Sequence, residues 1–154
     1  MSSKVIDSFK GEYYFLSNFY FSDISLRLNH KMWTFPTAEH SFQAAKIVVS
    51  NLSMEEKDLY IEDIIKNKNP VIAKRLGRKI SIDINTWSKN SSDVMFKIQK
   101  NKYFQNKELG LKLKLTGDSL LIEGNTWGDR IWGVSNGVGE NRLGKILMNV
   151  RSLL

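Results

Sequence analysis

The last segment of the chain carries the pattern that most constrains its fold. No linker, low-complexity tract or repeat divides the 154 residues, so an apolar face in this segment is expected to pack within the chain. Five apolar residues repeat there at intervals of three and four, which is the spacing of one helical face: Leu143, Ile146, Leu147, Val150 and Leu154. We therefore expect a single domain over residues 1–154, with its C-terminal helix in the core.

Signals for helix starts predict the other helices. Pro36 suits a first helical turn, where its missing N–H costs nothing, and Ser53 is a plausible N-cap. Asp83–Trp87 is expected to be a connection, after which Ser92 or Asp93 begins a helix. The other predicted helices cover about residues 36–50, Met54–Ile65, Asn69-Pro70 to Gly77, and Glu108–Leu115.

Short strands are expected between these helices. Apolar residues alternate in Ile24–Leu28, Asn29-His30 can turn, and Lys31–Thr34 can return as the second strand of a hairpin. Further short strands are predicted at Tyr13–Leu16, Leu120–Glu123 and Ile131–Val134. The predicted fold class is α+β and helix-rich, with a hairpin and short strands.

Composition narrows the chemistry and the partners. The chain has no Cys and only two His, which excludes disulfides and a cysteine nucleophile and disfavours a metal site. Its formal charge of +7 favours anionic partners, either phosphorylated metabolites or nucleic acid. No apolar run approaches membrane-spanning length and no signal core begins the chain, so no membrane contact and a cytoplasmic location are expected. Nothing in the sequence indicates an obligate protein partner.

Glu39, Gln43 and Lys46 form a polar stripe on the helix predicted near residues 36–50. Intervals of four and three residues bring a carboxylate, an amide and an ammonium onto one helical face. These groups can hold, protonate and neutralise a ligand. A solvated helix face explains the same spacing. His40 points to a different face and is expected to be structural.

A second candidate site lies in Trp127–Gly133. Two tryptophans bracket Asp129 and Arg130, and flat indole rings suit a heterocycle while a carboxylate can accept a proton or stabilise a cation. A turn with Trp127 and Trp132 as core anchors is the alternative. Trp87, which follows the expected connection, could line a cleft.

Asn18 and the segment Gly139–Lys145 are two further candidates for ligand binding, and each also has a purely structural explanation. Asn18 could bond a sugar hydroxyl or simply stabilise a turn. Gly139–Lys145 matches most of a phosphate-binding loop but lacks the Ser or Thr that should follow Lys145, where Ile146 stands. The start of the last helix could still receive a phosphate on its backbone N–H groups, or Asn141 could cap that helix.

Taken together, four segments resemble the NADAR, or YbiA-like, superfamily of N-glycosidases. They occur in the family's order and span roughly residues 9–154: Leu16-Ser17-Asn18-Phe19-Tyr20, Glu39-His40-x-x-Gln43-Ala44-x-Lys46, Trp127-Gly128-Asp129-x-x-Trp132-Gly133, and Asn141-x-Leu143-Gly144-x-Ile146-Leu147.

This resemblance implies hydrolysis of an N-glycosidic bond without a metal or a redox cofactor. It makes Glu39 and Asp129 the leading catalytic carboxylates and places Asn18, Gln43 and Lys46 near the ribose or phosphate. By the same resemblance, Trp87, Trp127 or Trp132 would lie near the base.

Three functions follow as expectations. The first is hydrolysis of phosphoribosylated pyrimidine intermediates of riboflavin biosynthesis. The second is removal of ADP-ribose from modified guanine in DNA or RNA, in an antitoxin or phage-defence setting, which the basic charge favours. The third, from another class, is a non-catalytic module that binds ADP-ribose or nucleic acid and releases no base.

Overall fold

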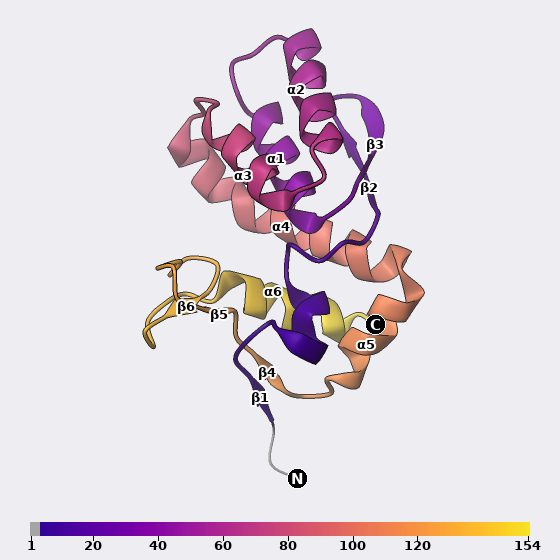
Figure 1. Cartoon of the computed structure of the whole chain (residues 1–154), viewed down its shortest axis with the longest axis vertical. Helices are drawn as coiled ribbons and strands as arrows, with labels where there is room; N and C mark the ends of the chain where they lie inside the picture. The colour runs from indigo at the N-terminus through magenta and orange to yellow at the C-terminus, as the bar shows by residue number, and fades with distance from the viewer. Residues whose placement is uncertain (1–3) are drawn as a thin grey trace.

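The helix expected near residues 36–50 is α1 (Ala38–Val48), and nine of its eleven residues are buried. The computed structural model describes residues 4–154. Thr37 begins the helix by accepting a hydrogen bond from the backbone N–H of His40. Other elements cover α1 on several sides, including α2 (Met54–Lys66), α3 (Pro70–Arg78) and α4 (Ile84–Gln105). Figure 1 shows α1 enclosed among these helices.

The predicted caps begin the helices around α1. Ser53 and Glu56 form a capping box at the start of α2, and the side chain of Asn69 caps α3 directly before Pro70. The remaining predicted helices are α5 (Lys107–Leu115) and the C-terminal α6 (Arg142–Ser152). Leu143, Leu147 and Val150 of α6 are buried as expected, whereas Ile146 and Leu154 are partly exposed.

Helix α4 is longer than the sequence suggested. The prediction of a connection at Asp83–Trp87 is wrong, because Asp83 accepts hydrogen bonds from the N–H groups of Asn85 and Thr86 and begins the helix there. The first turns of α4 are polar and mostly exposed, so they lack the apolar repeat that marks a helix. In Figure 1, α4 runs from the part around α1 toward α5.

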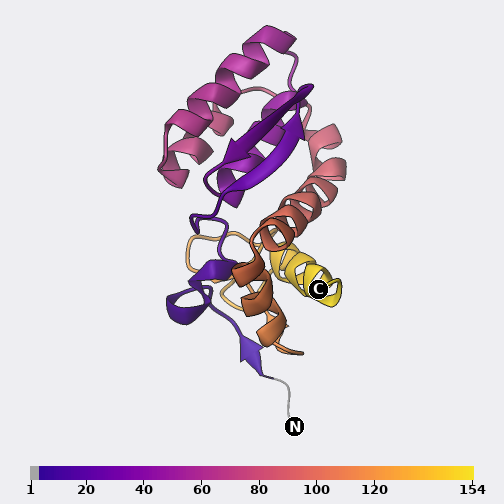
Figure 2. The same ribbon diagram turned by 90° about the vertical axis from the view of Figure 1, so that its right-hand side faces the viewer.

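Strands are few and short. The hairpin is present as β2 (Ile24–Leu28) and β3 (Lys31–Phe35), and Asn29 and His30 have the positive φ angles of 50° and 69° that a two-residue turn requires. Figure 2 shows this hairpin lying across the helices. Two parallel pairs complete the strands: β1 (Val5–Ile6) with β4 (Leu120–Leu121), and β5 (Gly124–Asn125) with β6 (Val134–Ser135).

Three strand predictions need correction. Tyr13–Leu16 belongs to a 3-10 helix, η1 (Gly11–Leu16), in which the carbonyl of Phe15 accepts hydrogen bonds from side chains of α4 rather than from a neighbouring strand. Of the strand predicted at Leu120–Glu123, only Leu120 and Leu121 form a strand, β4. Of Ile131–Val134 only Val134 is in a strand, since the preceding residues form bends.

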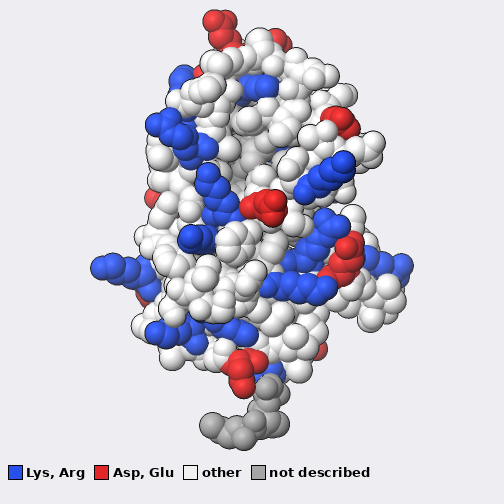
Figure 3. Space-filling model, turned by 180° about the vertical axis from the view of Figure 1, so that it is seen from behind, with Lys and Arg blue, Asp and Glu red and all other residues white. Residues whose placement is uncertain are grey.

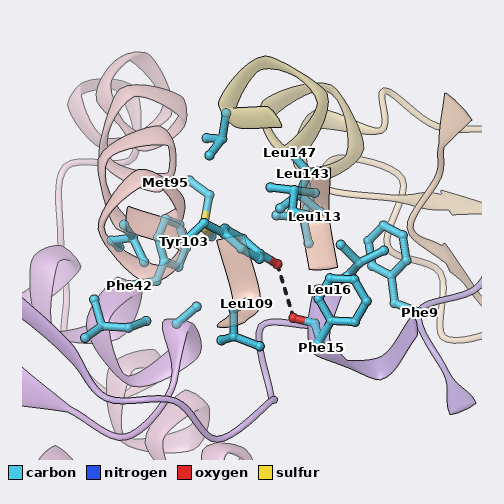
Figure 4. Packing of buried hydrophobic residues seen from close by; sticks show 14 of the residues in the cluster. Phe9, Phe15, Leu16, Phe42, Met95, Tyr103, Leu109, Leu113, Leu143 and Leu147 are labelled. Carbon is cyan, nitrogen blue, oxygen red and sulfur yellow. Dashed lines mark hydrogen bonds between the residues drawn. The ribbon is translucent and has the colours of Figure 1, made fainter. Parts of the chain in front are cut away.

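The main core lies where η1, α4, α5 and α6 meet α1 and the hairpin. Figure 4 shows Tyr103 inside this core, with its hydroxyl donating a 3.1 Å hydrogen bond to the carbonyl of Phe15. A smaller cluster of Ile47, Ile64 and Ala73 joins α1, α2 and α3. The observed architecture confirms the predicted helix-rich α+β class. Over residues 4–154, no helix combines the length and apolar character needed to cross a membrane.

Candidate active site

A cavity of about 780 Å³ brings together segments that are far apart in the sequence. Its walls come from Ser17–Phe19, from α1, from α3 and from the loop after β4. Six of the eight predicted site residues line it: Asn18, Glu39, Gln43, Trp127, Asp129 and Trp132.

Glu39 and Gln43 form the buried wall that α1 contributes. Their exposed fractions are 7% and 5%, so the alternative of a solvated helix face does not hold. The Nε2 group of Gln43 donates a 3.1 Å hydrogen bond to Oε1 of Glu39. The backbone N–H of Glu39 donates to the carbonyl of Asn18, which fixes the start of α1 against the Ser17–Phe19 wall.

The surroundings of Glu39 make its carboxylate more basic than usual. Burial raises the pKa of Glu39, and the charge of Asp129 raises it further. The hydrogen bond from Gln43 and the positive charges of Lys74 and Arg78 act in the opposite direction and lower the pKa. A base with a raised pKa accepts a proton from water more readily, provided that it is ionised at the working pH.

Asp129 is held by the backbone of its own loop. One oxygen, Oδ1, accepts hydrogen bonds from the N–H groups of Ile131 and Trp132 at 3.0 and 2.9 Å. The side chain of Asn125 bonds both the N–H and the carbonyl of Asp129. The turn proposed from the sequence is therefore present, and it also presents Asp129 to the cavity.

Aromatic rings form another part of the cavity wall. The rings of Phe42 and Trp132 meet edge to face, with their centroids 5.3 Å apart. Trp127 is 63% exposed and lines the cavity, so the alternative in which it anchors the core does not hold. Phe19 completes a surface on which a heterocycle can stack.

Helix α3 supplies a basic wall that sequence reasoning missed. Lys74, Arg75 and Arg78 line the cavity from one face of α3, and Lys10 lines it from another segment. The spacing of one and four residues that puts Lys74, Arg75 and Arg78 on one helical face was a readable signal, but no place in the site was assigned to them from the sequence. Figure 3 shows that basic side chains are also spread over the face behind the view of Figure 1.

Lys46 and Trp87 do not line the cavity. Lys46 is partly buried on α1, and burial together with the charge of Arg78 lowers its pKa. Trp87 packs against the cavity residue Phe42 with their ring centroids 5.0 Å apart, so it supports the wall from behind. The side chain of Asn18 is engaged as well: its Oδ1 accepts a 2.7 Å hydrogen bond from Gln99.

The start of α6 does not offer its backbone to a phosphate. The N–H groups of Glu140, Asn141, Arg142 and Leu143 donate to carbonyls of the Arg130–Gly133 segment. Asn141 does not cap the helix with its side chain either. Its amide instead bonds the N–H of Glu123 and the carbonyl of Leu121.

His40 has the structural role expected for it. Its Nδ1 lies 2.6 Å from the hydroxyl of Thr37 and its Nε2 lies 2.6 Å from the carbonyl of Asn67. Burial lowers its pKa, which favours a neutral ring. Within residues 4–154, no three His, Asp or Glu side chains are grouped closely enough to hold a metal ion.

Comparisons with known proteins identify the family of this chain. The model of the NADAR domain matches residues 7–154. N-glycosidase YbiA of Shigella sonnei (strain Ss046) is 37% identical over 131 residues, 84% of this chain and 75% of that protein. A riboflavin biosynthesis protein of Vibrio vulnificus (strain YJ016) is 35% identical over 142 residues, covering 91% of this chain and 35% of that protein.

A solved structure gives the same result for the fold. The NMR structure of the Escherichia coli protein YbiA matches with a TM-score of 0.78 and 31% identity, covering 99% of this chain and 86% of that one. Fold and cavity together define a helix-rich α+β protein with a buried carboxylate beside a basic helix. The chain belongs to the NADAR domain family, so the family predicted from the sequence is confirmed.

Proposed function

We propose that this protein hydrolyses the N-glycosidic bond of a phosphorylated N-riboside. The observation that carries the proposal is the buried Glu39 carboxylate, which faces a cavity with basic side chains on one wall and aromatic rings on another. The names of relatives as N-glycosidases support this activity, and the Vibrio relative's name supports a substrate from riboflavin biosynthesis, for which the family resemblance implies a phosphoribosylated pyrimidine.

The mechanism follows from the charge that the reaction creates. Breaking the bond between C1′ of ribose and the nitrogen of the base builds positive charge on the sugar. In this proposal Glu39 stabilises that charge and takes a proton from the attacking water. The amide of Gln43 holds the carboxylate in place through their hydrogen bond.

The other walls would bind the remaining parts of the substrate. Asp129 keeps Oδ1 on the backbone, so its second oxygen is proposed to accept a ribose hydroxyl. Lys74, Arg75 and Arg78 are proposed to bind the phosphate, since guanidinium and ammonium groups form charge-assisted hydrogen bonds with its oxygens. The base would stack between the rings of Trp127, Trp132 and Phe19.

A second substrate class is favoured by the charge. With a formal charge of +7 and an exposed Trp127 at the cavity edge, the protein has features that suit ADP-ribosylated nucleic acid. The non-catalytic module is the third candidate, and it predicts binding without release of a base.

One experiment separates the three functions. The protein is incubated with a phosphoribosylated aminopyrimidine and, separately, with an ADP-ribosylated oligonucleotide, and the released bases are identified by mass spectrometry. Release from the first substrate alone is expected. Release of a base from the oligonucleotide alone would show that ADP-ribosylated nucleic acid is the substrate. Release from neither would contradict an enzymatic function and favour the non-catalytic module.

A further inference from the structure

Glu123 is a cavity residue to which neither the sequence motifs nor the proposed mechanism gave a role. It lies two residues after the end of β4, and it lines the same cavity as Glu39 and Asp129. It was included only in the apolar run Leu120–Glu123, interpreted as a buried strand.

The backbone around Glu123 is fixed on both sides. Its N–H donates a 3.0 Å hydrogen bond to Oδ1 of Asn141, and its carbonyl accepts a 2.9 Å hydrogen bond from the N–H of Val134. Asn141 is itself buried, and its backbone is in the left-handed region with φ 54°. A residue in this uncommon conformation thus holds the segment that carries Glu123.

The carboxyl group of Glu123 is oriented as well. The Nδ2 group of Asn125 donates a 2.9 Å hydrogen bond to Oε2, and the same oxygen lies over Gly133, where a Cβ atom would collide with it. Asn125 also bonds Asp129, so one amide positions both acidic residues. Such support from neighbouring residues is what a preorganised functional group needs.

The three carboxyl groups in the cavity have different neighbours. Burial raises the pKa of Glu39, but its place in the first turn of α1 and the positive charges of both Lys74 and Arg78 act against this shift. Asp129 gives one oxygen to two backbone N–H groups, which leaves its second oxygen for the ribose hydroxyl proposed above.

Glu123 lacks a helix N-terminus of this kind. Burial and the negative charge of Asp129 raise its pKa, while the hydrogen bond from Asn125 and the positive charge of Lys74 lower it. Asp129 in the following loop and Lys74 on α3 are the charged groups that act on it. Glu123 thus combines a raised pKa with a carboxyl group that Asn125 orients in the cavity, which suits it to hold a proton and donate it.

We propose that Glu123 is the catalytic acid of the cavity and donates a proton to the leaving nitrogen. This inference rests on the proposed N-glycosidase function. As the C1′–N bond breaks, its electron pair goes to the nitrogen, and the Glu123 proton forms the new N–H bond. The oxygen of water bonds to C1′ while Glu39 takes the water proton, and exchange with solvent restores both carboxyl groups.

The Glu123→Gln variant tests this assignment. Gln has the same shape, and its amide oxygen can still accept the hydrogen bond from Asn125, but it has no acidic proton to donate. On the heterocyclic N-riboside we expect kcat to fall by about a hundredfold or more with little change in KM. The high-pH limb of the kcat profile, where wild-type Glu123 loses its proton, should disappear.

A substrate that needs no acid provides the decisive comparison. A 4-nitrophenyl ribofuranoside 5-phosphate releases a stable anion, so Glu123→Gln should hydrolyse it within about threefold of the wild-type rate. Glu39→Gln should lose activity on both substrates. The exposed Glu140 lies on the loop before α6, and Glu140→Gln serves as the matched control with wild-type activity on both.

The outcomes distinguish the two proposals. Equal losses on both substrates in Glu123→Gln, or a high-pH limb that persists, would overturn the acid assignment while the wild-type activity upholds the N-glycosidase. If the wild-type protein releases no base from any N-riboside, both the N-glycosidase function and the acid role of Glu123 are contradicted. Carbon NMR of labelled Glu side chains gives an independent reading, because Glu123 must titrate above the exposed glutamates.

Discussion

At the scale of single residues, the buried position of Glu39 determines both its chemistry and its energetic cost. A carboxyl group whose pKa is raised on folding binds more protons in the folded state than in the unfolded state. Between the unfolded pKa and the raised folded pKa, stability therefore falls as pH rises. The protein keeps this carboxylate in the cavity although an uncharged group there would be less costly to bury.

The Glu39→Gln variant should separate catalysis from stability. Gln preserves the shape, can accept the hydrogen bond from Gln43 and removes the charge, so we expect N-glycosidase activity to disappear. At neutral pH the melting temperature should be equal to or above that of the wild-type protein, because a buried charge is lost. Base release and a thermal melt measured on the same preparation check both parts. Retained activity would contradict the role of Glu39.

At the scale of secondary-structure elements, α3 packs closely against α1 through Gly77. A Cβ atom at this position would collide with the side-chain amide of Gln43, whose Oε1 is buried and has no hydrogen-bond partner within residues 4–154. The close approach thus holds the residue that orients Glu39. It links the packing of two helices to the geometry of the cavity.

Gly77→Ala should therefore affect both stability and activity. The overpacking cost of about 1–3 kcal/mol outweighs a gain of about 1 kcal/mol in helix propensity, so a moderate net loss in the free energy of unfolding is expected. Urea unfolding measures this loss, and kcat should fall because Gln43 is displaced. In the Gln43→Ala background the collision is absent. The double variant Gln43→Ala/Gly77→Ala should therefore be at least as stable as Gln43→Ala alone. A purely additive result would contradict this explanation.

The basic face of α3 gives a second prediction at this scale. Arg75 lines the cavity and is exposed, so Arg75→Ala removes a phosphate contact with little effect on the fold. We expect KM for a phosphorylated N-riboside to rise about tenfold or more, because charge-assisted hydrogen bonds contribute about 1.5–3 kcal/mol. The dephosphorylated riboside should show no such change. Lys79→Ala, outside the cavity lining at the end of α3, is the matched control. Equal effects on both substrates would contradict a phosphate contact.

Local signals explain which elements could be predicted from the sequence. Ser53, Asn69 and the Asn29-His30 turn act through bonds within a few residues, so the helices and the hairpin that they begin or join were predicted correctly. Helix α4 begins in a polar, exposed stretch, and η1 depends on Lys102 and Tyr103 far along the chain. Neither feature produces an apolar repeat. Asp83 was a local signal for the start of α4, since its side chain caps the helix through Asn85 and Thr86, but it was interpreted as part of a connection.

At the scale of the whole molecule, the cavity exists because distant segments meet. The family resemblance named Glu39, Gln43 and Asp129, and the structure places all three on the cavity wall. Spacing along one helix could not show that Lys46 lies off this wall while α3 contributes to it. Glu123 was hidden for the same reason, since its orientation comes from Asn125 and from Asn141 at the start of α6. Tertiary contacts of this kind leave no local pattern in the sequence.

Lys102 shows how one buried charge affects the stability of the whole molecule. Its side chain is fully buried on α4, and its Nζ donates hydrogen bonds of 2.8 and 3.0 Å to the carbonyls of Phe15 and Ser17. The rings of Tyr20 and Tyr103 lie 5.7 and 5.1 Å from this ammonium. Burial lowers the pKa of Lys102 to about 7. These contacts connect α4 with the segment that forms one wall of the cavity.

The stability of the protein should therefore rise with pH above about 7. Between the folded pKa of about 7 and the ordinary lysine pKa of 10.5, the unfolded chain binds one more proton at Lys102 than the folded protein does. Each pH unit in this interval should favour the wild-type protein over Lys102→Met by up to about 1.4 kcal/mol in the free energy of unfolding. Urea unfolding at several pH values between about 6 and 9 measures the difference. The upper limit of pH 9 avoids the titration of Tyr103. Burial raises the pKa of this tyrosine, so at higher pH it would ionise in the unfolded chain but not in the folded protein, and the free energy of unfolding would fall.

A matched variant and a clear contrary outcome complete this test. Lys100 is exposed on the same helix, so Lys100→Met should follow the wild-type dependence on pH. Lys102→Met also removes one hydrogen bond from each of the Phe15 and Ser17 carbonyls, which lowers stability at every pH by an amount that does not vary with pH. The slope of the difference against pH, and not its absolute size, therefore reports the buried ammonium. Parallel curves for the wild-type protein and Lys102→Met would mean that Lys102 keeps its ordinary pKa in the folded state.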